Sequence, residues 1–259
     1  MESYLTLSTE RDVACITLNR PASMNALSGE MLEALSQMLD TLQERTDIRA
    51  LIITGTGRAF CAGGDLHAFR QHVLERDFNG FHEKLLYAQR VFNKLERFPA
   101  PTIAAVNGYA IAGGLELLLC CDLVIAADTA QMGDGHARYA VIPAGGSSAR
   151  LPRKISPNRA NYLLLTGELV PASTMQEWGL VNSVVSPASL LDSAQSIARK
   201  MASLSPAGIR HIKKLAVDSL GLSVEQACAA ELDAFKEYAQ SSDFAEGLQA
   251  FHEKRPAVY

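Results

Sequence analysis

The chain has 259 residues, of which 48% are hydrophobic and 20% are charged, and its formal net charge is −4 at pH 7. These values exclude a disordered or collagen-like chain, and the acidic balance gives no general attraction to nucleic acid or to an anionic membrane. The length suits one large domain, or one domain with a small appendage.

The cysteines indicate a reducing compartment. Their number is odd and no CxxC pair is present, so they are expected to be buried free thiols. Residues 1–9 show no apolar core behind a basic flank, and no segment offers about 18 uncharged apolar residues. We therefore expect a cytoplasmic protein with no membrane partner. The cysteines are Cys15, Cys61, Cys120, Cys121 and Cys228.

The first half of the chain alternates strand and helix patterns. Residues 13–19 are a short β-branched run that ends at Arg20-Pro21, which is typical of a strand followed by a turn. Ser28 can cap a helix whose apolar residues recur at helical spacing. Residues 50–54 predict a second buried strand, and residues 66–96 predict a helical region.

The same alternation continues to the middle of the chain. Residues 102–106 predict a strand, 114–121 a helix and 123–127 a further strand. Strands alternating with helices predict an α/β layered core with right-handed crossovers. After residue 159 the pattern changes to consecutive helices, which we expect at residues 189–204, 206–220, 224–240 and 244–253. No repeat or linker separates the two parts, so independent domains are not expected.

The most informative stretch is a helix that is apolar all round except for Glu116 in its first turn. Such a helix must be buried. A buried carboxyl group is costly unless something uses it, and a desolvated one suits general acid–base catalysis. The alternative is that Glu116 only complements the N-terminus of its own helix, where a negative charge is favoured. The sequence leaves both interpretations open.

Two glycine-rich segments can supply backbone N–H groups to a ligand oxygen. Gly113 and Gly114 precede Glu116, and glycines let the amides at a helix N-terminus approach a ligand closely. A second small-residue loop, residues 60–65, follows the second predicted strand. Two converging amides can stabilise an enolate oxygen. Taken alone, however, the second loop is also compatible with an ordinary tight turn.

Several motifs in this order resemble the crotonase (enoyl-CoA hydratase/isomerase) superfamily, nearly from end to end of the chain. The resemblance implies a core spiral of ββα units in residues 1–200 and a C-terminal helical trimerisation region in residues 201–259, with trimers that commonly pair into hexamers. The motifs are Asn19-Arg20-Pro21, Asn25-Ala26-Leu27, residues 60–66, residues 105–110 through Glu116-Leu117, Ile142-Pro143 with Gly145-Gly146, and residues 246–255.

The resemblance also implies a substrate and a set of site residues. The substrate is an acyl-CoA thioester, with coenzyme A as a substrate carrier and no bound cofactor or metal. Ala62 and Gly113 would donate their N–H groups to the thioester oxygen, and Glu116 would be an acid/base residue. Residues implied for CoA binding are Met24, Ala26, Ala62, Gly63, Gly64, Asp65 and Leu66, together with Phe251 and Lys254 on the terminal helix.

The chain departs from the superfamily pattern at one position. Hydratases with two catalytic glutamates carry the second one twenty positions after the first, and here that position is His136. His136 can replace the glutamate as a proton carrier, since imidazole titrates near neutrality. Alternatively, Asp134 takes the role, or His136 and Arg138 recognise a polar or carboxylated acyl group and leave Glu116 as the single acid/base. All three interpretations stay open.

We therefore predict hydration of a 2-enoyl-CoA to a 3-hydroxyacyl-CoA, possible also on a branched or carboxylated acyl chain, with Glu116 and His136 as catalytic side chains. A double-bond isomerase is the nearest alternative, and acyl-CoA hydrolase and decarboxylase activities occur on the same scaffold. A non-catalytic or RNA-binding member of the superfamily is the alternative of another class. The acidic charge and the retained Glu116 argue against it.

Overall fold

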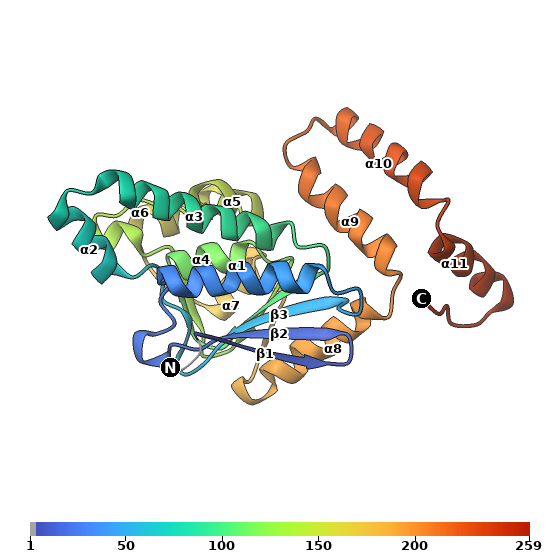
Figure 1. The fold of residues 1–259 in the computed structure, drawn as a ribbon, viewed down its shortest axis with the longest axis horizontal. Coiled ribbons are helices and arrows are strands. Elements are labelled where there is room, and N and C mark those ends of the chain that lie inside the picture. The colour runs from blue at the N-terminus through green and yellow to red at the C-terminus, as the bar shows by residue number, and fades with distance from the viewer. Residues whose placement is uncertain (1–3) are drawn as a thin grey trace.

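The computed structural model describes residues 4–259, and Figure 1 shows a layered α/β core from which the last helices project. Residues 1–3, part of the segment in which no signal sequence is predicted, lie outside the described residues. The strands are β1 (Leu5–Glu10), β2 (Val13–Leu18), β3 (Ala50–Gly55), β4 (Ala59–Cys61), β5 (Thr102–Val106), β6 (Tyr109–Ile111), β7 (Leu123–Ala127), β8 (Gln131–Gly133), β9 (Val170–Pro171) and β10 (Ser183–Val185).

The main sheet has six strands in the order β1-β2-β3-β5-β7-β10. β1 is antiparallel to β2, and the other neighbours are parallel. β3 and β5 are buried along almost their whole length, as expected for parallel strands covered on both faces. The predicted strands at residues 13–19, 50–54, 102–106 and 123–127 are therefore confirmed.

A second sheet has the order β4-β6-β8-β9 and lies where the site forms. Each of β4, β6 and β8 follows a main-sheet strand in the chain, and each leads toward a helix or helical turn. The chain thus repeats a strand, strand, helix unit, and successive units place their second strands side by side. This arrangement is the predicted spiral of ββα units.

The helices of the core cover both faces of the main sheet. Figure 1 shows α1 and α3 on one side and α8 on the other. Ser28 caps α1 as predicted, since its side chain accepts from the Met31 N–H. The core helices are α1 (Gly29–Gln43), α2 (Leu66–Glu75), α3 (Phe78–Glu96), α4 (Gly113–Leu119), α5 (Ser147–Lys154), α6 (Pro157–Thr166), α7 (Ala172–Trp178) and α8 (Leu190–Ala202).

The expected helical region at residues 66–96 is two helices instead of one. Arg76 ends α2 in the left-handed conformation (φ 54°), and the Asp77 side chain then caps α3 through the Gly80 N–H. Neither glycine nor proline marks this break, which explains why the pattern of apolar residues did not reveal it.

The last three helices, α9 (Pro206–Ser219), α10 (Val224–Tyr238) and α11 (Ser242–Glu253), extend away from the core in Figure 1. α9 is anchored by Lys213, which pairs with Asp122 at 2.7 Å and donates to the Ala100 carbonyl at 3.0 Å. Among the helices of residues 4–259, none has both the length and the apolar character needed to cross a bilayer. The division of the chain at residue 200 and the oligomerising role of its last part stay predictions.

Candidate active site

The site begins where the loop after β2 is joined to the loop after β4. The Ala62 N–H donates to the Met24 carbonyl at 3.0 Å, and the Leu27 N–H donates to the Gly63 carbonyl at 2.8 Å. These bonds bring together the two segments predicted to bind CoA, namely residues 24–26 and residues 62–66.

Two polar side chains fix this junction. Arg20 donates through Nη1 to the Ala26 carbonyl at 2.8 Å, and its Nη2 lies 3.6 Å from Asp65 Oδ2. Asn25 is fully buried, and its Nδ2 donates to the carbonyls of Thr56 (2.9 Å) and Ala59 (2.7 Å). The Asn-Arg-Pro and Asn-Ala-Leu motifs therefore have a structural function here.

The Ala62 N–H cannot serve as the predicted donor to a thioester oxygen, because the Met24 carbonyl already accepts it. The prediction for Ala62 is wrong in this respect. The structure brings the Gly64 and Gly113 amides together instead. A methyl group built on Gly113 would lie 3.3 Å from the Gly64 nitrogen, and one built on Gly63 would lie 3.3 Å from the Gly113 nitrogen. Within residues 4–259, neither the Gly64 nor the Gly113 N–H donates a hydrogen bond.

The backbone turn at Ala112 presents the Gly113 amide. Ala112 lies between β6 and α4 and donates its N–H to the Gly133 carbonyl at 3.1 Å. Its φ is 52°, a conformation that is costly for a residue with a Cβ. The chain then enters α4, whose first amides have no partner in their own helix. The next glycine, Gly114, packs so closely on the Cys61 carbonyl that a side chain there would overlap it.

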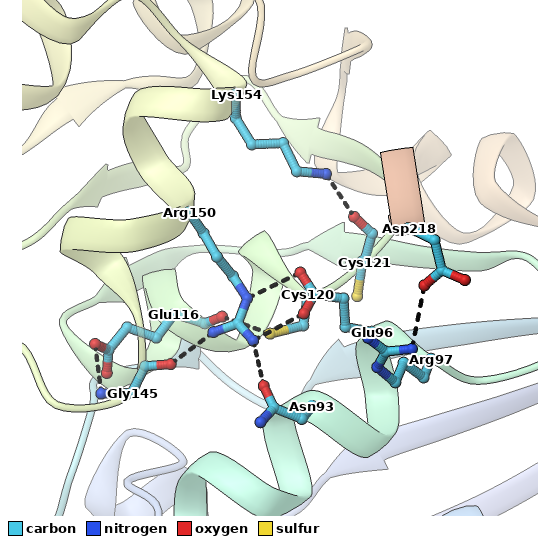
Figure 2. A network of polar contacts seen from close by, with 10 residues as sticks. All are labelled: Asn93, Glu96, Arg97, Glu116, Cys120, Cys121, Gly145, Arg150, Lys154 and Asp218. Atoms are coloured by element: carbon cyan, nitrogen blue, oxygen red, sulfur yellow. Dashed lines mark hydrogen bonds and ion pairs between the residues drawn. The ribbon is translucent and has the colours of Figure 1, made fainter. Parts of the chain in front are cut away.

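Glu116 is 3% exposed and points from α4 to the loop before α5 (Figure 2). Its Oε1 accepts from the Gly145 N–H at 2.8 Å and from the Ser147 N–H at 3.1 Å. Oε2 accepts no hydrogen bond from residues 4–259, and Glu116 has no ion pair among them. Glu116 therefore does not only complement the N-terminus of its own helix, the alternative interpretation, because its carboxylate also binds the amides before α5. The amides of Gly145 and Ser147 were not predicted from sequence, although Gly145-Gly146 belongs to a recognised motif.

His136 begins a single turn of 3-10 helix, His136–Tyr139 (η2), after β8. Its Nδ1 lies 3.0 Å from Oδ2 of Asp134, a fully buried residue. Burial lowers the pKa of His136, but the hydrogen bond and charge of Asp134, with the charge of Glu116, outweigh it and raise the pKa above its ordinary value. The second carboxylate oxygen, Asp134 Oδ1, is buried and has no hydrogen-bond partner within residues 4–259.

Phe251 and Lys254 are not near this site. They lie at the end of α11, and Figure 1 shows α11 at the opposite end of the molecule from α2, which begins just after the Gly63-Gly64 loop. Phe251 is 84% exposed. The predicted contact of these residues with CoA is therefore not made within one copy of the chain.

The buried cysteines do not add a reactive thiol to this site. All five cysteines are free, and four are buried; Cys228 is exposed, so the prediction that it is buried is wrong. Burial raises the pKa of Cys61, the last residue of β4, to about 12, so this thiol is not a ready nucleophile. The part of the chain that the structure describes contains no group of three or more His, Cys, Asp or Glu residues placed to bind a metal ion.

Comparison with known proteins shows the family of the chain. The sequence pattern of the enoyl-CoA hydratase/isomerase family matches residues 8–259. The chain belongs to this family. It is 38% identical to the protein YngF of Bacillus subtilis over 100% of this chain and 98% of the relative. It is 35% identical to the crotonyl-CoA hydratase of Syntrophomonas wolfei, over 98% and 96% of the two chains.

The solved structures confirm the predicted crotonase-like fold. The enoyl-CoA hydratase of Bacillus anthracis superposes with a TM-score of 0.93 at 35% identity, and the match covers 99% of both chains. The shared fold therefore includes the whole α/β core.

Proposed function

We propose that this family member adds water to a 2-enoyl-CoA thioester and forms a 3-hydroxyacyl-CoA. The oxygen of water bonds to C3 of the acyl chain, and a proton is delivered to C2. The observation that carries the proposal is the geometry of Glu116. Two amides donate to its Oε1, and its Oε2 is left available. Glu116 also lies on the helix whose first amide, that of Gly113, is close to the Gly64 amide. The hydratase names of several relatives support it.

In this mechanism the Gly64 and Gly113 N–H groups hold the thioester oxygen as it gains negative charge. Their positions are fixed before the substrate arrives, so no reorganisation is needed during the reaction. The start of α4 adds its positive end, which favours an enolate oxygen at that place. Removal of one such donor costs about 10²–10³ in rate in other enzymes.

Glu116 transfers a proton between water and the acyl chain. Because Oε1 is held by Gly145 and Ser147, the orientation of the carboxylate is set and Oε2 is the reactive oxygen. A water that Oε2 orients loses a proton to it as the water oxygen bonds to C3. General acid–base catalysis of this kind contributes about 10²–10⁴ in rate.

His136 is our proposal for the second proton-transferring group, in place of the missing glutamate. A carboxylate can only accept, so the Nδ1 that lies beside Asp134 carries a proton. Nε2 is then the atom that exchanges protons with the substrate. The raised pKa of His136 favours an imidazolium that can donate to C2.

A double-bond isomerase remains the second candidate, because one specific observation favours it. Glu116 is the only carboxylate at the two positions that carry glutamates in two-glutamate hydratases, and a single carboxylate suffices to move a proton between two carbons of the acyl chain. The same amides would hold the thioester oxygen. An isomerase adds no water, so the two reactions give different products from the same probe.

We propose that CoA lies along the joined loops that contain Met24, Ala26, Gly63, Asp65 and Leu66. Phe251 and Lys254 would reach the CoA of a neighbouring copy in a homotrimer or a pair of trimers. The projecting helices support an assembly, since they expose apolar side chains that include Ile212, Leu220, Val224, Leu232, Phe235 and Leu248. The free, mostly buried cysteines fit a cytoplasmic location.

The test is turnover of a panel of straight, branched and carboxylated enoyl-CoAs in water enriched in the heavy oxygen isotope. Hydration predicts a product heavier by water, with the label in the new hydroxyl group. A product of unchanged composition with a moved double bond would instead establish the isomerase. Release of free CoA or of carbon dioxide would indicate a hydrolase or a decarboxylase.

A further inference from the structure

Arg150 on α5 lies beside the loop before this helix, which contains Gly145, and its side chain is only 14% exposed (Figure 2). Its Nε and Nη2 donate to the two carboxylate oxygens of Glu96 at 2.9 and 2.8 Å. Nη2 also donates to Asn93 Oδ1 at 2.6 Å, and Nη1 donates to the Gly145 carbonyl at 2.9 Å. One guanidinium thus connects helix α3 to the backbone of Gly145.

The Gly145 residue connects this arginine to Glu116. Its carbonyl accepts from Arg150, while its N–H donates to Glu116 Oε1. The two bonds lie on opposite sides of one Cα, so the orientation of the residue is fixed from both ends. A shift of the Gly145 carbonyl would therefore turn the N–H that holds the carboxylate.

The packing around the loop before α5 leaves no room for a side chain at Gly145 or Gly146. A side chain on Gly145 would overlap Glu116 Oε2 and come within 2.6 Å of Phe92 Cε2. Gly146 has a φ of +119°, and a side chain there would overlap Arg150 Nη1. The guanidinium is therefore in direct contact with both glycines that shape the loop.

We propose that Arg150 is a positioning residue for Glu116, which acts by clamping the Gly145 carbonyl so that the Gly145 and Ser147 amides both face the carboxylate. This inference rests on the proposed role of Glu116 as the acid/base residue. Arg150 itself contacts neither the reacting atoms nor the two amides that hold the thioester oxygen. Glu96 holds the guanidinium in place, and the hydrogen bond and charge of Arg150 lower the pKa of Glu96 against the effect of its burial.

The competing explanation is that Arg150 only joins α5 to α3 and stabilises the fold. Two substitutions separate the explanations. Arg150→Lys keeps a positive charge for Glu96 but loses the planar fork that reaches Glu96, Asn93 and Gly145 together. Glu96→Gln removes the ion pair but leaves the Arg150 contact with the Gly145 carbonyl. A matched control is Arg153→Met, because Arg153 is an exposed arginine on the same helix.

The experiment measures kcat, KM and the melting temperature with crotonyl-CoA as the probe, together with crystal structures of the Arg150→Lys and Arg150→Met variants. We expect Arg150→Met to lower kcat about 10²-fold, as a displaced catalytic group does. Arg150→Lys should lower kcat less than this but more than Glu96→Gln, with KM nearly unchanged. Arg153→Met should match the unmodified protein. The crystal structures should show the Gly145 N–H turned away from Glu116 Oε1.

The inference is overturned if Arg150→Lys is folded and retains the kcat of Arg153→Met. It is also overturned if Glu96→Gln and Arg150→Lys lose activity only in proportion to lost folded protein. Should the unmodified protein hydrate no enoyl-CoA, the proposed function fails. The crystal structures still decide on Arg150, since a Gly145 to Glu116 hydrogen bond that survives in both variants would remove its positioning role.

Discussion

The two sides of the site differ in how firmly their ionisable groups are held. Glu116 lies on a regular buried helix, two amides hold one of its oxygens, and Arg150 fixes the residue that supplies the first of these amides. His136 lies on one 3-10 turn bounded by Gly135 and Ala140, which both have positive φ, and its partner Asp134 has one oxygen without a hydrogen bond within residues 4–259.

This difference indicates where the choice of reaction lies. Every acyl-CoA reaction considered for this fold needs a stabilised thioester oxygen, and hydration and isomerisation both need a proton carrier at a fixed place. The Glu116 side supplies both. We propose that the second group, on the His136 side, decides between hydration and isomerisation.

The largest effect is expected from Glu116→Gln. The variant keeps the shape of the side chain and an oxygen that can accept from Gly145 and Ser147, but it cannot take up a proton. We expect kcat to fall about 10³-fold, with KM and melting temperature nearly unchanged. Glu33→Gln, at an exposed position of α1, is the control. Near-normal turnover by Glu116→Gln would remove Glu116 from the mechanism.

A smaller loss is expected from Gly145→Ala. Its methyl group would overlap Glu116 Oε2 and press on Phe92, so the carboxylate must move. We expect kcat to fall about 10²-fold and stability to fall by about 1–3 kcal/mol, measured by steady-state kinetics and chemical unfolding. Gly29→Ala is the matched control because a methyl group there meets nothing within 4 Å. If Gly145→Ala has the same kcat and stability as Gly29→Ala, the loop at Gly145 is not tightly packed against Glu116.

On the His136 side, Asp134→Asn should change the pKa of His136 and the pH dependence of stability, and should change the structure little. Asparagine can still accept from His136 Nδ1 but carries no charge, so the pKa of His136 should fall, as followed by its NMR titration. The folded pKa of His136 is raised, so the pair stabilises the protein fully below the unfolded value of about 6.5 and loses this effect as pH rises through the folded value.

The stability difference between the unmodified protein and Asp134→Asn should therefore shrink between pH 6 and pH 9, pH values chosen to bracket this transition. Asp128→Asn, at an exposed site, is the control. If the His136 titration is the same in both variants, Asp134 does not tune the histidine. The hydration mechanism would then lose the physical basis for its second proton carrier.

The smallest effect concerns the turn into α4. Ala112 has a φ of 52°, so Ala112→Gly relieves backbone strain and should raise stability by about 1 kcal/mol, net of the greater freedom of glycine in the unfolded chain. Ala34→Gly, inside α1, should instead lower stability by about 0.5–1 kcal/mol. A melting curve of each variant checks the opposite signs. Destabilisation by both would mean that the turn carries no strain.

Much of the fold could be predicted because buried strands and amphipathic helices leave clear patterns. β3 and β5 are almost wholly apolar, and the C-terminal helices repeat apolar residues at helical spacing. β1 was not predicted, because only Leu5 of its six residues is buried. β4, β6 and β8 have three residues each, too few to show a period.

The sequence could predict which segments form the site, but it could not predict which single backbone amides face the substrate. Gly113 and Glu116 could be chosen as candidates because glycines and one acid interrupt an apolar helix. Ala62 was assigned in place of Gly64, since no sequence pattern shows that the Met24 carbonyl takes up the Ala62 N–H. The hydrogen bonds from Gly145 and Ser147 to Glu116 likewise join segments that are distant in the sequence. Such contacts depend on how the ββα units stack.

The most direct test of the account is a crystal structure of the protein with a saturated acyl-CoA, butyryl-CoA, which cannot be hydrated. We predict that its thioester oxygen accepts hydrogen bonds from the Gly64 and Gly113 N–H groups, that Glu116 Oε2 faces C2 and C3, and that the Ala62 N–H stays bonded to Met24. A thioester oxygen bound anywhere else, with these two amides left facing solvent, would contradict the central claim.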